Sequence, residues 1–168
     1  KEAFYIARTG RPGPVLIDVP VDVPKAAGEV SYAGPCVIRG YHPDRAKKVD
    51  LKDIQRAADM INQSKRPVLY VGGGIIISEA SKELRAFAKK AGIPVTTTLT
   101  GLGCFDEHDP LSLGMLGMHG TAYANHAVQG SDLLISIGAR FDDRVTGKIA
   151  AFAPNAKIIH VDNDPSSI

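Results

Sequence analysis

The stretch Pro67-Val68-Leu69-Tyr70-Val71-Gly72-Gly73-Gly74 decides the fold. Its first five residues form an uninterrupted apolar run, which is typical of a strand that is buried on both faces, as in a parallel sheet. Three glycines follow at once and indicate a tight turn into the next element. We expect that element to be a helix, with Ser78 as its N-cap and Gly92 as its end.

Strands and helices alternate on both sides of this unit. Before it, Asp50 is a good N-cap for a helix whose apolar residues recur at helical spacing as far as Ser64. After it, the pattern predicts strands at residues 93–98, 132–137 and 157–161, a helix at 121–129 and a short helix at 148–152. Alternation at this pitch implies parallel pairing through right-handed crossovers. The expected fold class is therefore α/β, a doubly wound parallel sheet with helices on both faces.

The first 48 residues follow a different pattern. A helix is expected over residues 2–9, and the turn Arg11-Pro12-Gly13-Pro14 leads into an apolar run, residues 15–19, that we predict to be a buried strand. Proline and glycine then recur too often for a continuous element, so residues 25–48 are interpreted as a linker. Because the chain starts at Lys1, within a helical pattern and without an apolar signal region, we expect it to be an excised fragment.

Composition excludes several classes of function. Lys and Arg number 20 against 18 Asp and Glu, so the net charge of +2 predicts no nucleic-acid partner. The most apolar stretch, residues 68–77, is far shorter than the roughly 18 residues of a membrane-spanning helix, so no membrane partner is expected. Cys36 and Cys104 are interpreted as ordinary buried or half-exposed thiols. His119 and His126 lack the spacing of metal ligands, and we predict no metal site.

Ligands of open parallel sheets bind beyond the carboxyl ends of the strands, so the loops that follow the predicted strands are the candidate sites. Gly72-Gly73-Gly74 departs from the dinucleotide fingerprint G-x-G-x-x-G, because Ile77 stands at the position of the last glycine. Close approach of a ligand and a purely structural turn explain these glycines equally well.

The segment Gly114 to Thr121 places glycines directly before a predicted helix. Such glycines leave backbone N–H groups that, together with the helix dipole, can bind an anion or a pyrophosphate. Met115 and Met118 could flank a flat ring, although methionines near a core more often fill space.

The loop from Gly138 to Gly147 is the most informative one. It carries Arg140 and Arg144, whose fork of donors suits a phosphate or a carboxylate. Two Arg–Asp salt bridges within the loop are a competing explanation, and the two explanations do not exclude each other. Asp162 and Asp164 follow the last predicted strand and could accept hydrogen bonds from a ribose, although Asp before Pro is also a common turn former.

These loops together indicate a nucleotide-shaped ligand with a diphosphate. The residues show no Ser/His/Asp order, no activated cysteine and no carboxylate pair arranged for proton transfer. We therefore predict binding and no catalytic residue in this chain.

The motifs also resemble the catalytic large subunits of the acetolactate synthase (acetohydroxyacid synthase) family of thiamine-diphosphate enzymes. The residues that carry the resemblance are Arg11-Pro12-Gly13-Pro14-Val15 with Asp18 and Pro20, Gly72-Gly73-Gly74, Thr96-Thr97-Thr98-Leu99 with Gly101-Leu102-Gly103, Gly114-Met115-Leu116-Gly117-Met118-His119-Gly120, and Gly138-Ala139-Arg140-Phe141-Asp142-Asp143-Arg144-Val145-Thr146-Gly147. The resemblance implies that residues 1–24 end a pyrimidine-binding domain. It also implies that residues 49–168 form most of a Rossmann-like central FAD-binding domain, truncated at its C-terminal end.

By the same resemblance the ligand of this chain is FAD. The positions that match flavin contacts are Arg11, Gly72, Gly73, Gly74, Thr98, Leu99, Gly117, Met118, His119, Gly120, Thr121, Gly138, Ala139, Arg140, Arg144, Val145, Asp162 and Asn163. Met118, Asp143 and Arg144 match positions of the substrate channel, where the arginine recognises the second 2-oxo acid.

The resemblance further implies that the parent enzyme condenses pyruvate with pyruvate or 2-oxobutyrate, in branched-chain amino-acid biosynthesis. Thiamine diphosphate and Mg²⁺ would be bound by domains absent here, so the chain alone is expected to be inactive. The implied assembly is a homodimer or homotetramer with a regulatory small subunit as a further partner, in the cytoplasm or an organellar matrix. One departure is Val21 before Asp22, where the family usually has Lys.

Two alternatives stay open. The parent could be another FAD-containing thiamine-diphosphate enzyme, such as glyoxylate carboligase or pyruvate oxidase, although the run Phe141 to Arg144 favours acetolactate synthase. The second alternative is a non-catalytic nucleotide-binding module that shares only the fold and predicts no flavin.

Overall fold

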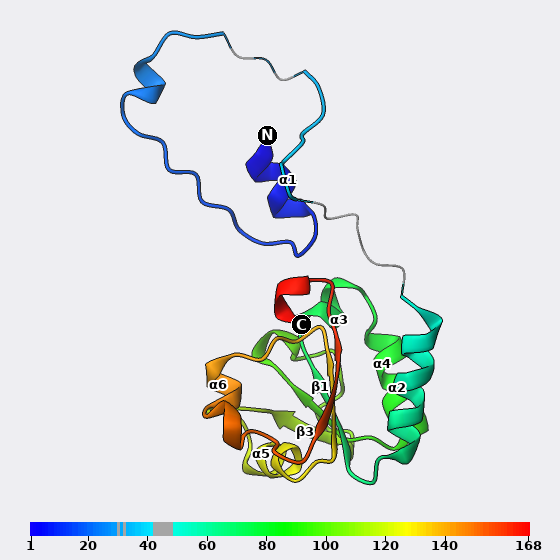
Figure 1. Cartoon of the computed structure of the whole chain (residues 1–168). Helices are drawn as coiled ribbons and strands as arrows, with labels where there is room; N and C mark the ends of the chain where they lie inside the picture. The colour runs from blue at the N-terminus through cyan, green and yellow to red at the C-terminus, as the bar shows by residue number, and fades with distance from the viewer. Residues whose placement is uncertain (30, 32, 42–48) are drawn as a thin grey trace. The chain divides into compact units, whose positions relative to one another are not determined.

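The computed structural model describes residues 1–29, 31, 33–41 and 49–168, and the chain divides into two compact units, Lys1–Lys48 and Val49–Ile168 (Figure 1). Residues 30, 32 and 42–48 of the predicted linker lie outside the described residues.

The Val49–Ile168 unit is built on a five-stranded sheet in which every pairing is parallel. Its strands are β1 (Pro67–Val71), β2 (Val95–Thr97), β3 (Ser112–Met115), β4 (Leu133–Ile137) and β5 (Lys157–Val161), in the order β3-β2-β1-β4-β5. The chain moves outward from β1 through β2 to β3 and then returns to the other side of β1 as β4. The fold class is confirmed, and the strand order reverses between β1 and β4, where Val71 pairs with Ile137.

Helices cover both faces of the sheet (Figure 1). The helical elements of this unit are α2 (Leu51–Gln63), α3 (Gly73–Ile77), α4 (Ser81–Ala91), α5 (Ala122–Gln129) and α6 (Asp143–Thr146), with the 3-10 turns η2 (Leu99–Gly101), η3 (Ile149–Ala151) and η4 (Pro165–Ser167). Met60 of α2 and Leu84 of α4 pack in one core cluster, whereas Val128 of α5 and Val145 of α6 pack in a second. Alternate residues of β1 enter the two clusters, which explains why this strand is apolar along its whole length.

The N-cap predicted at Asp50 and the helix end predicted at Gly92 are confirmed. The carboxylate of Asp50 accepts from Lys52 N at 2.9 Å. Thr121, the first residue of the helix expected at 121–129, is the N-cap of α5, because its hydroxyl accepts from Ala124 N at 3.1 Å. Gly92 ends α4 in the left-handed conformation, with φ of 65°.

The prediction that Ser78 is an N-cap is wrong. Helix α3 begins directly in the glycine turn, and Ser78 ends it by donating its hydroxyl to Gly74 O at 2.7 Å. The next helix, α4, starts only after Ala80.

Four further elements differ from the prediction. Strand β3 lies in a stretch where we predicted no strand. Gly114 separates its two apolar residues, Leu113 and Met115, so that the four residues show no apolar run and only their pairing with β2 defines the strand. Helix α6 lies inside the predicted 138–147 loop. The helix expected at 148–152 is only the 3-10 turn η3, and the strand expected at 93–98 is limited to β2.

The Lys1–Lys48 unit contains the expected first helix, α1 (Glu2–Arg8), and a 3-10 turn, η1 (Val23–Lys25). The buried strand predicted at residues 15–19 is wrong, since the segment forms no ladder and the side chain of Leu16 is 92% exposed. Apolar residues favour extended backbone, but a strand exists only where a neighbouring strand takes its hydrogen bonds. The described part of this unit offers no such neighbour.

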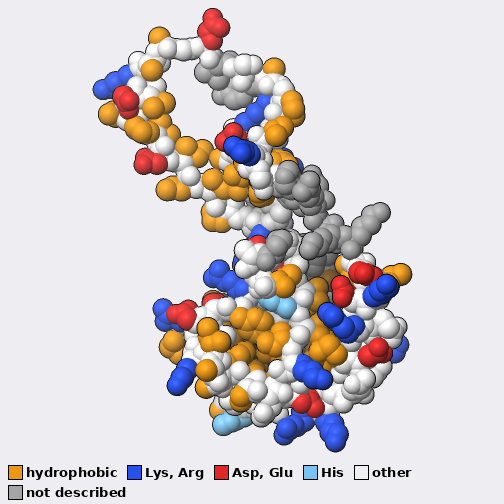
Figure 2. All heavy atoms as spheres, in the orientation of Figure 1, with side chains coloured by type: hydrophobic (Ala, Val, Ile, Leu, Met, Phe, Trp, Pro, Cys, Tyr) orange, Lys and Arg blue, Asp and Glu red, His pale blue; other side chains and the backbone are white. Residues whose placement is uncertain are grey.

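Strand β5 forms one edge of the sheet. Figure 2 shows hydrophobic side chains gathered around this edge, and Ile158 and Val161 are each about half exposed. Cys104 is buried and Cys36 is partly buried, which confirms them as ordinary thiols. None of the described helices has the length and apolarity needed to cross a membrane.

Candidate functional site at the carboxyl ends of the strands

The loops that follow β1, β4 and β5 are joined by backbone hydrogen bonds at the point where the strand order reverses. Gly72 N donates to Ile137 O at 3.1 Å, and Gly74 N donates to Gly138 O at 3.1 Å. Gly138 N in turn donates to Val161 O at 2.8 Å. This crevice is the place where doubly wound sheets bind their ligands.

The packing of these loops is by itself sufficient to require glycine at two positions. A Cβ atom at Gly72 would lie 2.3 Å from Gly138 O, and one at Gly74 would lie 2.6 Å from Gly138 Cα. Any larger residue would push the β1 and β4 loops apart. These two glycines therefore have a structural cause that is independent of any ligand.

The loop after β3 is fastened to the loop after β4. Met118 N donates to Arg144 O at 2.9 Å, so two residues predicted to line a substrate channel are neighbours. The side chain of Asn125 in α5 holds the other end of the turn, because its Nδ2 donates to Gly117 O and its Oδ1 accepts from Gly117 N. Sequence reasoning missed Asn125, which stands one helical turn after the cap Thr121.

The prediction that the Gly114 to Thr121 segment offers free N–H groups to an anion is wrong for most of its turn. The N–H groups of Gly117, Met118, Gly120 and Thr121 all have acceptors within the protein. The reason is that β3 extends to Met115, so the turn after it folds back on itself. Only Met118 of the two methionines lies in the loop, and its side chain is exposed, as is that of His119.

The free N–H groups lie instead in the loop after β4. Within the described part of the chain, the peptide N–H groups of residues 139–143 have no acceptor, and the next one, Arg144 N, donates to the carboxylate of Asp142 at 3.0 Å. A run of unpaired donors of this kind is suited to bind an anion.

Both arginines of this loop form the salt bridges considered from the sequence. Arg140 Nε lies 3.9 Å from Asp142 Oδ2, and Arg144 Nε lies 3.8 Å from Asp143 Oδ2. The two arginine side chains are 61% and 70% exposed. Exposed ion pairs at this distance contribute little, so both guanidinium groups stay accessible to a ligand.

Three side chains that sequence reasoning missed lie beneath this loop. Ser136 Oγ donates to Ala139 O at 2.9 Å, and His160 Nε2 lies 2.9 Å from the same oxygen. The hydroxyl of Tyr70 donates to Arg140 O at 3.4 Å. Burial raises the pKa of Tyr70 well above its ordinary value, so its hydroxyl stays protonated and can act as this donor. The signal for Tyr70 and Ser136 was a polar group inside an otherwise apolar strand.

The ring of Phe141 anchors the same loop. Its centroid lies 5.6 Å from that of Tyr70, 5.4 Å from that of His160 and 5.9 Å from that of Phe152. Aromatic rings at these separations attract one another and bury apolar area. Arg140 is thus held between an anchored Ala139 and an anchored Phe141.

The remaining predicted contacts lie at the ends of β2 and β5. Thr97 Oγ1 is buried and has no hydrogen-bond partner among the described residues, whereas Thr98 Oγ1 accepts from Gly101 N and caps η2. Leu99 is largely exposed. Asp162 Oδ1 accepts from Asp164 N at 2.9 Å, so this carboxylate also shapes its own turn.

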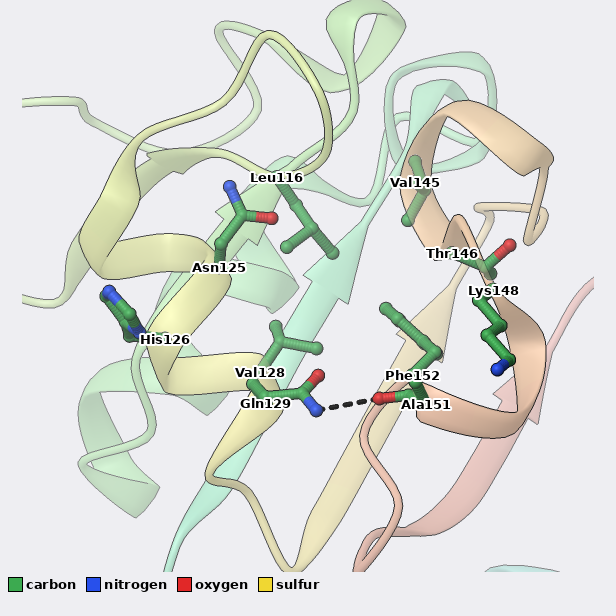
Figure 3. A pocket seen from close by; sticks show the side chains of 10 residues that line it. All are labelled: Leu116, Asn125, His126, Val128, Gln129, Val145, Thr146, Lys148, Ala151 and Phe152. Carbon is green, nitrogen blue, oxygen red and sulfur yellow. Dashed lines mark hydrogen bonds between the residues drawn. The ribbon is translucent and has the colours of Figure 1, made fainter.

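A cavity of about 280 Å³ lies beside the strand-end loops, between α5 and the α6–η3 segment (Figure 3). Leu116, Val128, Val145 and Phe152 form its apolar wall, and the amide of Gln129 closes one end by donating to Ala151 O at 2.7 Å. No group of three His, Cys, Asp or Glu side chains that could hold a metal ion exists among the residues that the structure describes. Arg11 lies in the Lys1–Lys48 unit, and its role stays a prediction.

The chain matches known proteins along its whole length. Residues 54–168 match the family described as "Thiamine pyrophosphate enzyme, central domain". The chain is 52% identical over 168 residues to acetolactate synthase 1, chloroplastic, of Zea mays. The aligned region is 100% of this chain and 26% of that protein. The chain is also 53% identical to the acetolactate synthase large subunits of Corynebacterium glutamicum and Cyanidium caldarium. Each of these alignments includes 99% of this chain, and they cover 26% and 29% of the two relatives, respectively. The chain therefore spans little more than a quarter of these relatives.

Proposed function

The chain belongs to the thiamine pyrophosphate enzyme family through its central domain, and from this premise we propose that it binds FAD within an acetolactate synthase. The observation that carries the proposal is the loop after β4, where Arg140 stands beside the unpaired N–H groups of residues 139–143 at the reversal of strand order. The names of the similar proteins support the activity of the parent.

The residues present fit a flavin dinucleotide. The free N–H groups and the guanidinium of Arg140 suit its diphosphate, and they lie between the loop of β1 and the end of β5. Asp162, at the end of β5, suits the adenosine ribose, and the exposed side chains of Leu99 and Met118 offer apolar surface to a flat ring. The carboxylates of the same loop repel an anion, so the attraction between the arginines and the diphosphate must exceed this repulsion.

The proposed flavin contacts of the unit are Gly72, Gly73, Gly74, Thr98, Leu99, Gly117, Met118, His119, Gly120, Thr121, Gly138, Ala139, Arg140, Arg144, Val145, Asp162 and Asn163, joined by Arg11 of the first unit. We also propose that residues 1–24 end a preceding domain and that residues 49–168 belong to the FAD-binding domain.

Thiamine diphosphate, bound with Mg²⁺ elsewhere in the parent, would stabilise the negative charge that develops on carbon when two 2-oxo acids are joined. The residues of this chain would orient the 2-oxo acid substrate. Met118 and Arg144, which a backbone hydrogen bond joins, would border the substrate channel with Asp143, and the exposed guanidinium would bind the carboxylate of pyruvate or 2-oxobutyrate. We propose that the chain alone is inactive. We further propose that the parent is a homodimer or homotetramer with a regulatory subunit, in the cytoplasm or an organellar matrix.

Titration of the 168-residue chain with FAD tests the binding proposal. A perturbed flavin spectrum and a raised melting temperature are expected, since a ligand at 100 times its Kd stabilises a protein by about 2.7 kcal/mol. Arg140→Ala should weaken binding, whereas Arg85→Ala, which removes an exposed arginine from α4, should not. Stabilisation by NAD with no response to FAD would instead support the nucleotide-binding module.

The activity of the parent is tested separately. Acetolactate formed from pyruvate, without activity on glyoxylate, would support acetolactate synthase against glyoxylate carboligase. Acetolactate formed by the 168-residue chain alone, with pyruvate, thiamine diphosphate and Mg²⁺, would overturn the proposal that it is inactive.

A further inference from the structure

We propose that Ser136, His160 and Tyr70 are positioning residues that aim the loop carrying Arg140. They come from three adjacent strands, β4, β5 and β1, and hold two consecutive carbonyl groups, those of Ala139 and Arg140. The identity of the ligand rests on the proposed FAD function, but the clamp itself is a property of the protein.

Ala139 O is contacted by two side chains, the hydroxyl of Ser136 at 2.9 Å and Nε2 of His160 at 2.9 Å. Ser136 is fully buried, so no solvent could replace its hydroxyl as the donor. A carbonyl oxygen only accepts, so His160 Nε2 carries the proton in this contact. The structure thereby assigns the Nε2–H form of the imidazole.

The clamp decides where the N–H groups of the loop point. No cis peptide bond occurs among the described residues, and in a trans peptide the C=O and N–H groups point in opposite directions. Because the carbonyls of Ala139 and Arg140 are turned toward the strands beneath, the N–H groups of Arg140 and Phe141 are turned away from them. Both of these N–H groups belong to the run without an acceptor in the described structure.

The surroundings prevent the loop from turning over. Gly138, with φ of 59°, starts the turn, and a Cβ atom there would lie 2.7 Å from Gly74 Cα. Phe141 closes the turn by packing against Tyr70 and His160. The loop is therefore preorganised before a ligand arrives, which lowers the entropy cost of binding.

The chain contains a matched control for Ser136. Ser131 is also fully buried, and its hydroxyl donates to Val128 O at 2.7 Å, three residues away, as that of Ser136 does to Ala139 O. Ser131 precedes β4 and Ser136 lies near its carboxyl end, so the two serines occupy opposite ends of this strand. Their alanine variants should lose similar stability, and only the one at residue 136 should disturb the clamp.

Two measurements on the 168-residue chain test the proposal. Ser136→Ala should weaken FAD binding roughly fivefold, the effect of one hydrogen bond, whereas Ser131→Ala should change it less than twofold. Without FAD, trypsin should cleave after Arg140 faster in Ser136→Ala than in Ser131→Ala. Equal effects of the two variants on both measurements would overturn the clamp.

His160 provides a test that general destabilisation would not mimic. His160→Leu should weaken FAD binding and speed cleavage after Arg140, and His160→Gln, which keeps a side-chain N–H donor, should restore both. Nitrogen NMR of the imidazole should show the Nε2–H form in the wild-type chain. The opposite tautomer, or a glutamine variant no better than leucine, would refute the assignment. If the wild-type chain binds no FAD, the binding proposal fails, and cleavage and NMR still decide the clamp.

Discussion

The backbone N–H of Met118 donates to the carbonyl oxygen of Arg144 at 2.9 Å, and this hydrogen bond ties the loop after β3 to the loop after β4. The contact depends on Gly117, because a Cβ atom at this position would lie 2.8 Å from the same carbonyl oxygen. The two loops at the proposed substrate channel can therefore approach only where residue 117 has no side chain.

We expect Gly117→Ala to destabilise the chain and to separate Met118 from Arg144. Gly103→Ala is a matched control, since Gly103 also has positive φ, of 87°, but open space around its Cα. The control should cost about 1 kcal/mol through backbone strain, and Gly117→Ala should cost at least 1 kcal/mol more through the clash. Urea unfolding measures the difference, and equal losses would show that the loops are not in contact.

Asp132 should make the free energy of unfolding depend on pH in the acidic range. Its carboxylate accepts hydrogen bonds from the hydroxyl of Ser64 and from the backbone N–H groups of Lys65 and Arg66, which lowers its pKa to about 2. A depressed folded-state pKa stabilises the fold above the ordinary value of 3.8, and this contribution is lost as the pH falls toward 2. The turn between α2 and β1 is fastened to β4 by these contacts.

Urea unfolding of wild type and Asp132→Asn between pH 7 and pH 2.5 checks this prediction. The stability difference between the two proteins should be largest near neutral pH and should shrink below about pH 4. Asp53→Asn removes an exposed carboxylate from α2 and serves as the control. A difference that grew on acidification would contradict the assigned direction.

The buried hydroxyl of Thr97 should be dispensable for folding. Because Oγ1 has no partner among the described residues, Thr97→Val removes an unsatisfied polar group and keeps the shape of the side chain. We expect about 1 kcal/mol of stabilisation without ligand. Thr96→Val is the control, since Thr96 Oγ1 donates to Gly114 O at 2.9 Å and its loss should destabilise. A destabilised Thr97→Val would mean that its hydroxyl is satisfied.

The two aspartates after Phe141 should behave differently although each pairs with an arginine. Asp142 caps α6 by accepting from Arg144 N at 3.0 Å, whereas Asp143 is 85% exposed and pairs loosely. Asp142→Ala should cost about 1 kcal/mol, the usual effect of losing an N-cap, and Asp143→Ala should be nearly neutral. Thermal unfolding compares them, and equal losses would argue against the cap.

Much of the fold could be predicted from local pattern. The apolar runs of β1, β4 and β5, the N-cap Asp50 and the helix end Gly92 mark strands and helix ends without reference to the rest of the chain. Strand β3 could not be found in this way, because it is only four residues long and Gly114 interrupts its apolar residues, so that only pairing with β2 makes it a strand. Residues 15–19 show the converse, an apolar run with no neighbouring strand in the described part of its unit.

The sequence by itself determined the α/β class, the strand-end loops and the candidate arginines, because strand period, helix caps and donor chemistry are local properties. Only the tertiary structure decided which N–H groups are free, since this depends on acceptors distant in the chain. The sequence predicted unpaired donors in the Gly114 to Thr121 segment, whereas the described structure has them at residues 139–143. The tertiary structure also brought Tyr70, Ser136 and His160 beneath one loop, because parallel strands place residues far apart in sequence side by side.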